Sequence, residues 1–170
     1  NRETLIRSMV WYTEQFKDDH AKTVILENGE PAVELSFRMP IELQSPDGEP
    51  YLMCGHMDRL VEYAGTTYVL DYKTSGSALG SYYFDKFSPD NQVSLYTLAA
   101  NVVLKTKAMG VIIDGVQLLA GFNRFARGIV MRTKGQTQEW LDDAIEWIKL
   151  AERWAETGKW PMNDTACDKY

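Results

Sequence analysis

The 170-residue sequence has little cysteine, histidine or continuous apolar sequence, and each scarcity excludes a class of protein. Cys54 and Cys167 are the two cysteines, too few for a disulfide scaffold, so a reducing, intracellular setting is the default expectation. With two histidines, His20 and His56, the chain also lacks the well-spaced soft ligands of a zinc cage. No apolar run approaches the roughly 20 residues that span a membrane. We therefore expect a cytoplasmic protein with no membrane partner.

Positive charge is also scarce, since the formal net charge is −6. This argues against broad, non-specific coating of nucleic acid. A nuclease is not excluded, because metal-binding carboxylates carry part of the negative charge and a bound cation reverses it locally. One segment is richer in basic residues and contains Arg124, Arg127, Arg132 and Lys134. This stripe either contacts phosphate, with Arg124 and Arg127 as candidate DNA-binding residues, or protects a solvated strand edge by its charge.

Length and hydrophobic periodicity predict one globular domain of mixed α/β class. Helices are predicted over residues 3–17, from Ser88-Pro-Asp-Asn to about residue 104 with Pro89 in the first turn, and over residues 136–156. Residues 32–43 are the first predicted strand, whose alternation puts Val33, Leu35, Phe37, Met39 and Ile41 on one face. The other strands are predicted over residues 51–63, 67–74, 109–119 and 122–133. This order implies a mixed sheet with helices packed on its faces. Residues 76–90 are predicted to form a loop. In the last helix, Trp140, Trp147 and Trp154 recur at helical spacing, together with two alanines, and this stripe is predicted to be a core seam.

The most informative pattern is a pair of acidic motifs, GHMD ending at Asp58 and DYK beginning at Asp71. They lie in two predicted strands joined by a candidate tight turn at Ala64-Gly65. A two-residue loop there places Asp58 directly opposite Asp71, with Cβ atoms about 4.5–5.5 Å apart. Because side chains alternate along a strand, Lys73 shares the face of Asp71, and Tyr72 takes the other face.

Two opposed carboxylates repel each other unless a counter-charge lies nearby. Lys73 offsets part of that repulsion, and a divalent cation offsets more. Hard oxygen ligands favour Mg²⁺ or Mn²⁺, so Asp58 and Asp71 are candidate metal ligands. The alternative for Asp71 and Lys73 is an ordinary salt bridge on the surface of a strand.

A third motif, QVSLY, lies on the next predicted helix and places Gln92 and Tyr96 on one face. GHMD, DYK and QVSLY together resemble the GxxD, DxK and QxxxY motifs of RecB-like, phage-type nucleases in the PD-(D/E)XK superfamily. The resemblance also includes Gly110-Val-Ile-Ile-Asp114 and Trp160-Pro-Met-Asn163. It implies a restriction-endonuclease-like mixed β-sheet flanked by α-helices. It also implies a single nuclease domain over residues 1–170, open to truncation at either end.

The resemblance implies roles for individual residues. Asp58 and Asp71 would bind one or two divalent cations, Mg²⁺ or Mn²⁺, together with the backbone carbonyl of Tyr72. Lys73 would orient or polarise the attacking water, so Asp58, Asp71 and Lys73 would be the catalytic residues.

The residues around this centre have alternatives that the sequence leaves open. Gln92 and Tyr96 would contact DNA or position the catalytic lysine. Thr74, with Ser75 beside it, either contacts phosphate or shapes the turn. His56 lies near the metal or is a hydrogen-bonded structural histidine.

The chain departs from the family pattern in two places. Relatives usually have an upstream helix that gives a His or Glu to the metal, and here His20 fits that role poorly. Glu34 is a better acidic candidate, or else an outward-facing strand residue. Many relatives also end in a cysteine cluster that binds iron and sulfur. Cys167 looks like the first element of such a cluster, but four cysteines are normally needed, so no iron–sulfur cluster is expected in this chain.

These patterns support three hypotheses. The first is a Mg²⁺- or Mn²⁺-dependent deoxyribonuclease with DNA as its partner, acting as an exonuclease on ends or single strands. Its setting would be recombination, repair or phage DNA processing, in the cytoplasm of a cell or of a phage host. The second is a catalytically impaired nuclease fold that binds DNA or assembles a complex. The third is an unrelated metal-dependent hydrolase of small phosphate esters.

Overall fold

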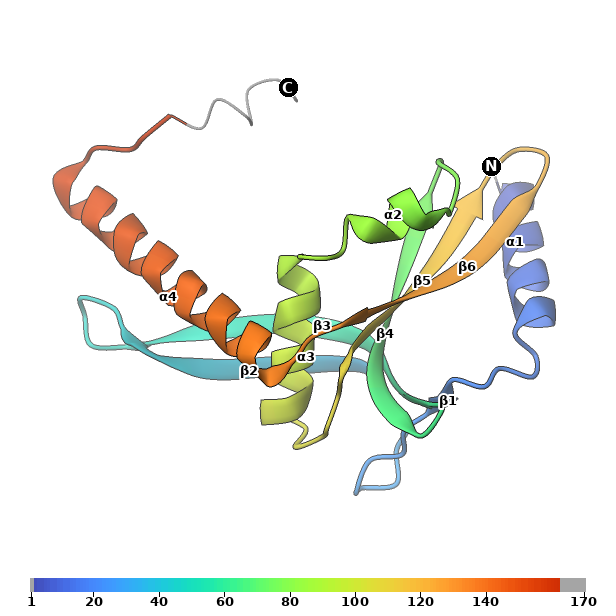
Figure 1. The fold of residues 1–170 in the computed structure, drawn as a ribbon, viewed down its shortest axis with the longest axis horizontal. Coiled ribbons are helices and arrows are strands. Elements are labelled where there is room, and N and C mark those ends of the chain that lie inside the picture. The colour runs from blue at the N-terminus through green and yellow to red at the C-terminus, as the bar shows by residue number, and fades with distance from the viewer. Residues whose placement is uncertain (1, 163–170) are drawn as a thin grey trace. The chain divides into compact units, whose positions relative to one another are not determined.

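The structure is a computed structural model that describes residues 2–162, and the chain divides into two compact units, Asn1–Thr137 and Gln138–Tyr170. The elements are α1 (Arg2–Gln15), β1 (Lys22–Thr23), β2 (Val33–Gln44), β3 (Pro50–Tyr63), β4 (Thr66–Ser75), α2 (Ser81–Asp85), α3 (Asn91–Val102), β5 (Gly110–Leu118), β6 (Asn123–Met131) and α4 (Lys134–Thr157) (Figure 1). Within the described residues, no helix is both long and apolar enough to cross a membrane.

A single mixed sheet organises the first unit. Its strand order is β1-β3-β4-β5-β6, and β2 pairs with a different part of β3. β4 and β5 are parallel, whereas every other pair of neighbours is antiparallel. A parallel pair needs a long crossover, and the segment that contains α2 and α3 supplies it. The predicted mixed sheet is thus confirmed.

The β3–β4 hairpin has the predicted turn. Tyr63 pairs with Thr66, and the two loop residues Ala64 and Gly65 both have positive φ, 49° and 74°. Positive φ at both positions is what a type I′ turn requires, and it suits the right-handed twist of the strands. The paired ladder ends at Arg59 and Leu70, one step before Asp58 and Asp71. The predicted register is therefore confirmed, but the two aspartates lie where the strands separate.

β2 and the first part of β3 form a two-stranded ribbon (Figure 1). Phe37, Met39 and Ile41 are buried, as the alternation predicts, but Val33 is 44% exposed. The expectation that Val33 shares the buried face is wrong. The backbone of Glu34 has a φ of 51°, and a left-handed residue interrupts the regular alternation of a strand.

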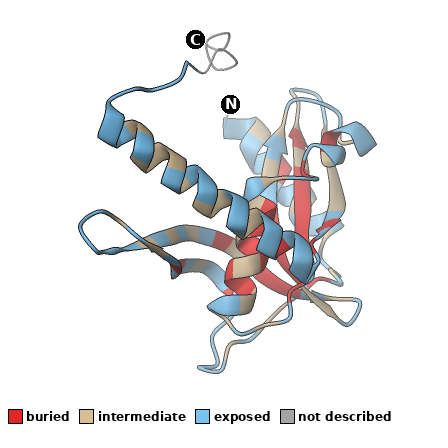
Figure 2. Cartoon of the chain, turned by 60° about the vertical axis from the view of Figure 1, so that its left-hand side comes forward, coloured by how far each residue is buried: buried red, intermediate tan, exposed pale blue. Residues whose placement is uncertain are grey.

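Helices pack against both faces of the sheet, and the buried residues form one cluster on each face (Figure 2). We call the face covered by α3 the front face. There, Val69, Val111 and Ile113 pack with Val93 and Ala100. The opposite face, toward α1, is the back face, on which the main apolar residues are Val61, Tyr68, Leu70 and Ile112. Because neighbouring residues alternate between these clusters, the central part of β4 and the first six residues of β5 are continuously buried.

Two short elements were missed from the sequence. α2 lies in the segment predicted to be a loop, and its five residues are too few to show a helical period. β1 has two residues that pair with Val61 and Glu62. The next helix, α3, begins after its N-cap Asp90, whose carboxylate accepts a hydrogen bond from the backbone N–H of Val93. Pro89 therefore precedes the cap and is not in the first turn.

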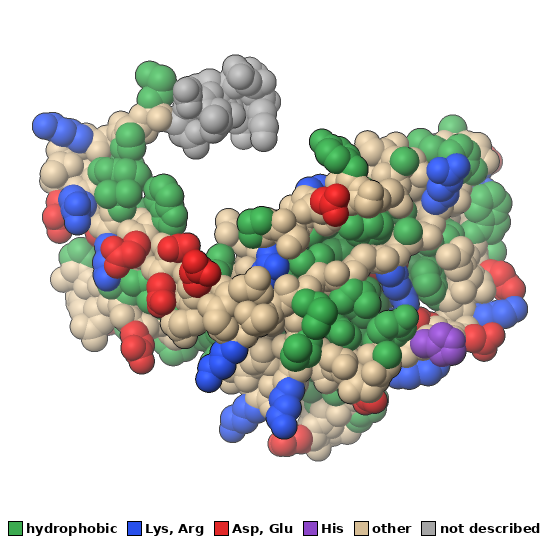
Figure 3. Space-filling model, viewed as in Figure 1, with side chains coloured by type: hydrophobic (Ala, Val, Ile, Leu, Met, Phe, Trp, Pro, Cys, Tyr) green, Lys and Arg blue, Asp and Glu red, His purple; other side chains and the backbone are tan. Residues whose placement is uncertain are grey.

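The second unit consists mainly of α4, which ends near Gly158, where φ is 64°, as the sequence predicts. The prediction that its tryptophans form a core seam is wrong for Trp147, which is 65% exposed. Trp140 and Trp154 are half-buried, and the Trp154 and Trp160 rings lie 6.2 Å apart. Apolar and acidic side chains alternate along the visible side of this helix (Figure 3). Cys167 lies outside the described residues.

Candidate active site

The front face carries a chain of four polar side chains from β4 and α3. Lys73 Nζ lies 2.7 Å from Asp71 Oδ2 and donates a hydrogen bond of 2.7 Å to Gln92 Oε1. The Gln92 amide in turn donates to the Tyr96 hydroxyl at 2.8 Å. Gln92 and Tyr96 lie one turn apart on α3, which explains how both reach the same place. The structure thus joins the DYK and QVSLY motifs through Lys73.

Asp71 is the most deeply buried member of this chain, at 3% exposure. Burial raises the pKa of Asp71, while Lys73 acts to lower it and the charge of Asp58 raises it further. Its Oδ2 atom is in contact with the lysine but has no hydrogen bond of good geometry among the described residues. A buried carboxylate oxygen in this condition is costly unless a cation or a proton satisfies it.

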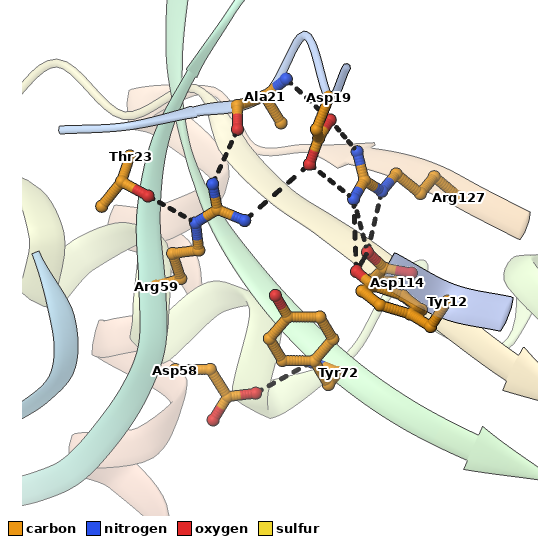
Figure 4. Close-up of polar contacts among 9 residues, drawn as sticks. All are labelled: Tyr12, Asp19, Ala21, Thr23, Asp58, Arg59, Tyr72, Asp114 and Arg127. Carbon is orange, nitrogen blue, oxygen red and sulfur yellow. Dashed lines mark hydrogen bonds and ion pairs between the residues drawn. The ribbon is translucent and has the colours of Figure 1, made fainter. Parts of the chain in front are cut away.

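Asp58 lies beside Asp71 at the point where β3 leaves β4. Its Oδ2 atom accepts a 2.8 Å hydrogen bond from the backbone N–H of Tyr72 (Figure 4). This bond takes the place of the ladder bond that is lost where the strands separate. The carboxylate of Asp58 is thereby fixed to the backbone between Asp71 and Lys73.

These residues fit a hard divalent cation. Two carboxylates and one ammonium leave one negative charge, and the two carboxylates supply oxygen ligands of the kind that such a cation prefers. Among residues 2–162, however, no group of three or more His, Cys, Asp or Glu side chains is arranged for a metal ion. Glu34 lies between two paired positions that bracket Asp58, but its side chain is exposed and does not complete the pair. The roles of Glu34 and the Tyr72 carbonyl as metal ligands stay predictions.

The back face carries a second polar cluster, beside the ring of Tyr72 (Figure 4). Asp114, which is fully buried, pairs in register with Tyr72 on β4 and with Arg127 on β6. Its Oδ2 atom accepts hydrogen bonds from Arg127 Nε at 2.8 Å and from the Tyr12 hydroxyl at 2.6 Å. Arg127 also donates two bonds to the carboxylate of Asp19, at 2.6 and 2.9 Å.

A second arginine completes this cluster. Arg59 donates to the Thr23 hydroxyl and to the Ala21 carbonyl, each at 2.8 Å, and lies 3.8 Å from Asp19. Burial acts to raise the pKa of Asp19, but hydrogen bonds from Arg127 and Ala21 and the two arginine charges outweigh it, so the pKa is lowered. The cluster therefore ties α1 and the segment after it to three strands.

The remaining carboxylate, phenol and guanidinium of the cluster have shifted pKa values too. Burial raises the pKa of Asp114 although Tyr12 and Arg127 oppose it. Burial and the carboxylate of Asp114 raise the pKa of Tyr12 above its ordinary range. The carboxylates raise the pKa of Arg127 against the effect of its burial. Arg127 is thus a fixed cation and Tyr12 a fixed hydrogen-bond donor.

The structure separates the basic residues that the sequence groups together. Arg127, expected as a DNA contact, donates hydrogen bonds to Asp19, Asp114 and Tyr12. Because its guanidinium is already bound within the protein, the expectation of a DNA contact is not supported. Arg132 is 7% exposed and donates to the Ser94 hydroxyl, so it too is a structural residue. Arg124 is exposed and lies over the Phe122 ring, and it stays a candidate DNA contact.

The two histidines, which the sequence offers as further candidates near the metal, have other surroundings. His20 lines a pocket of about 440 Å³ with Phe16, Ile112 and Arg127 on the back face. His56 Nδ1 lies 2.8 Å from the Ser36 hydroxyl, as the structural alternative expects.

Thr74 and Ser75, at the end of β4, have different surroundings. Ser75 binds the backbone of Ser77 and shapes the turn. Thr74 is exposed and stays a candidate DNA contact.

A family model of the PD-(D/E)XK nuclease superfamily matches residues 1–169. The chain belongs to this superfamily. No curated protein matches the sequence. In this PD-(D/E)XK chain the DYK sequence lies on β4, the central strand of the order β1-β3-β4-β5-β6.

One solved structure shares this fold. A crystal structure of a candidate exonuclease from Eubacterium rectale has a TM-score of 0.52 and 14% identity, and the match covers 99% of this chain and 59% of that one. This PD-(D/E)XK chain thus spans about three-fifths of the length of that protein. Another structure, named SSO0001, is 16% identical with a TM-score of 0.39, over 84% of this chain and 57% of that one.

Two residues near the site were missed from the sequence. Tyr83 of α2 is buried, and the charges of Lys73 and Asp71 both act on its phenol. Tyr12 holds Asp114, and its ring centre lies 6.0 Å from that of Tyr72. In the sequence, the run of aromatic residues at 82–87 could have indicated that Tyr83 is important, whereas no local sequence pattern distinguishes Tyr12.

Proposed function

We propose that the chain is a Mg²⁺- or Mn²⁺-dependent deoxyribonuclease that acts as an exonuclease on DNA ends or single strands, in recombination, repair or phage DNA processing. Membership of a nuclease superfamily gives the general reaction, hydrolysis of a phosphodiester. The observation that carries the proposal is the chain Asp71–Lys73–Gln92 beside Asp58. We call Asp58, Asp71 and Lys73 the front cluster, in which the ammonium of Lys73 is held against the carboxylate of Asp71.

The proposed chemistry assigns one task to each side chain. Asp58 and Asp71 would hold the cation, which supplies a more acidic bound water and neutralises charge on the phosphate. Lys73 is held on two sides, by Asp71 and Gln92, so its ammonium is preorganised toward charge that develops on the phosphate oxygens. Tyr96 fixes the amide of Gln92 and so fixes which end faces the lysine.

The test is cleavage of labelled single-stranded, linear duplex and circular DNA with Mg²⁺, with Mn²⁺ and with chelator. Asp71→Ala and Lys73→Ala should each lower kcat by about 10²–10³-fold or more, because each removes a preorganised charge. Lys17→Ala, an exposed lysine that follows α1 and pairs with Glu14, serves as the matched control for loss of one surface charge. Full activity of both site variants would contradict the proposal. Cleavage of linear but not circular DNA would establish the exonuclease mode.

A second candidate function rests on a specific observation. The described residues bring no third acidic or histidine side chain to Asp58 and Asp71. The chain would then bind DNA or assemble a complex without cutting it. Metal-independent DNA binding, with no product under any metal condition, is the result that would favour this function.

A further inference from the structure

α2 and the two residues after it carry four aromatic side chains, which differ in exposure. Tyr83 and Phe87 are each 7% exposed, and Phe84 is half-buried. Tyr82 is 91% exposed. Three rings of this segment therefore anchor it, and one ring is presented to solvent.

The anchoring is tight enough to fix the position of α2. The Phe84 ring lies on Gly128 of β6, where an added Cβ would come within 2.3 Å of the ring. Leu79, just before α2, lies on Gly115 of β5 at 3.0 Å by the same measure. The Tyr83 ring also packs edge-on against Phe84, at 5.1 Å between centroids. A side chain at either glycine would push α2 away from the sheet.

This fixed segment lies next to the candidate active site. α2 follows the DYK strand after a short turn, and its Tyr83 belongs to the same core cluster as Tyr96. The charges of Lys73 and Asp71 both act on the Tyr83 phenol. Tyr82 precedes Tyr83 on the same short helix, so the exposed ring extends from an element that packs beside the candidate active site.

A cation accompanies the exposed ring. Lys86 follows Tyr82 by four residues, one helical turn, and its backbone continues in the helical region. Its Nζ atom lies 4.0 Å from the Tyr83 centroid and 4.9 Å from that of Phe87. These contacts hold the ammonium of an exposed lysine on the anchored part of α2.

We infer that Tyr82 and Lys86 form a platform for one unpaired nucleotide of the substrate strand. Tyr82 stacks on the base and Lys86 contacts an adjacent phosphate, the combination that binds single strands without sequence preference. The inference rests on the proposed nuclease function and deepens it. A paired base inside a duplex has no free face to offer, so the platform selects a single strand or a frayed end.

The experiment measures binding of a fluorescent single-stranded oligonucleotide by the full chain, and cleavage of the same strand. Tyr82→Ala should weaken binding by about 5- to 100-fold, the range for loss of one stacked base, and raise KM with kcat little changed. Tyr82→Trp should restore binding. Lys86→Gln should reduce the slope of log K against log salt by about 0.7, the value for one phosphate contact. Trp11→Ala, at an exposed aromatic of α1 on the back face, is the control and should change neither quantity.

The outcomes separate the two proposals. Unchanged binding and KM in Tyr82→Ala, with cleavage still abolished by Asp71→Ala, would overturn the platform and leave the nuclease proposal standing. Failure of Tyr82→Trp to restore binding would also overturn it, because stacking tolerates any large ring. A wild-type chain that neither binds nor cuts DNA would overturn both. Since Tyr82 is 91% exposed, the alanine variant is expected to fold normally.

Discussion

The front and back clusters of the sheet are built from the same kinds of residue but differ in charge. The front cluster has Asp58 and Asp71 with Lys73, which gives two negative charges and one positive, a net charge of −1. The back cluster, with Asp19, Asp114, Arg59 and Arg127, has two of each sign and is neutral. A neutral buried cluster needs no further charge to balance it, whereas a cluster with net negative charge favours the binding of a cation.

The two clusters also differ in the cation that each uses. Arg127 has five donors in a planar fork, and in the back cluster it binds two carboxylates and a phenol at once. Lys73 is a point charge on a flexible stem, and its side chain is 29% exposed. The arginine cluster is fixed in shape, while the lysine stays accessible to an incoming group. Accessibility and incomplete charge balance together distinguish a site from a structural ion pair.

The largest expected effect breaks the back cluster. Arg127→Met leaves the carboxylates of Asp19 and Asp114 without their guanidinium, and loss of one partner of a buried pair costs about 3–5 kcal/mol. Urea unfolding in chelator should show this loss, while kcat per folded molecule changes little. Arg124→Met, an exposed arginine of the same strand, should stay within about 0.5 kcal/mol of wild type. If Arg127→Met instead weakened DNA binding at unchanged stability, Arg127 would be a DNA contact after all.

The next effect concerns the front cluster. Gln92→Ala removes the acceptor that orients Lys73, and loss of such an outer partner lowers activity by about 10–100-fold, or about 1.4–2.8 kcal/mol. Steady-state kinetics should show this loss in kcat, with KM nearly unchanged. Tyr96→Phe, which deletes the acceptor of the Gln92 amide but keeps the ring, should have a smaller effect in the same direction. A rise in KM at constant kcat would show that Gln92 contacts DNA and does not position the lysine.

The sequence predicts the front cluster because its geometry is local. One turn sets the register of β3 and β4, strand alternation puts Asp71 and Lys73 together, and helical spacing puts Gln92 beside Tyr96. The back cluster is not local: Tyr12 lies 102 residues from Asp114, and Arg127 lies 108 residues from Asp19. No sequence pattern fixes such contacts before the fold is known. The alternation on β6 did offer a partial signal, since Arg124 and Arg127 lie three apart and so take opposite faces.

Other differences have similar physical causes. α2 has five residues, so its aromatic run reads as a loop, and its position depends on Gly115 and Gly128, which lie far along the chain. A single left-handed residue, Glu34, changes which side chains of β2 face the core, and sequence alternation cannot show a positive φ. The spacing of the tryptophans in α4 predicts the helix correctly. It does not predict how far each tryptophan ring is buried.

The smallest expected effect is a difference between the two clusters in how the stability of the protein depends on pH. Burial raises the pKa of Asp71 above its ordinary 3.8, so the folded chain holds this proton more tightly than the unfolded chain. The stability from this group is complete below about pH 3.8 and is lost as the pH rises through the folded pKa. Asp71→Asn should therefore be more stable than wild type at neutral pH in chelator, and the advantage should vanish in acid. Asp19→Asn should behave oppositely, because the pKa of Asp19 is lowered and its contribution is lost as the pH falls.

Unfolding by urea between about pH 3 and 7, in chelator and then with Mn²⁺, measures both slopes. Mn²⁺ should stabilise wild type at neutral pH, where Asp71 is ionised, and should stabilise Asp71→Asn less. If Asp71→Asn lost stability at neutral pH as Arg127→Met does, the front pair would be a structural ion pair like the back one. Because the variants differ from wild type by one charge each, the sign of the change decides between a site that awaits a cation and a cluster that is already balanced.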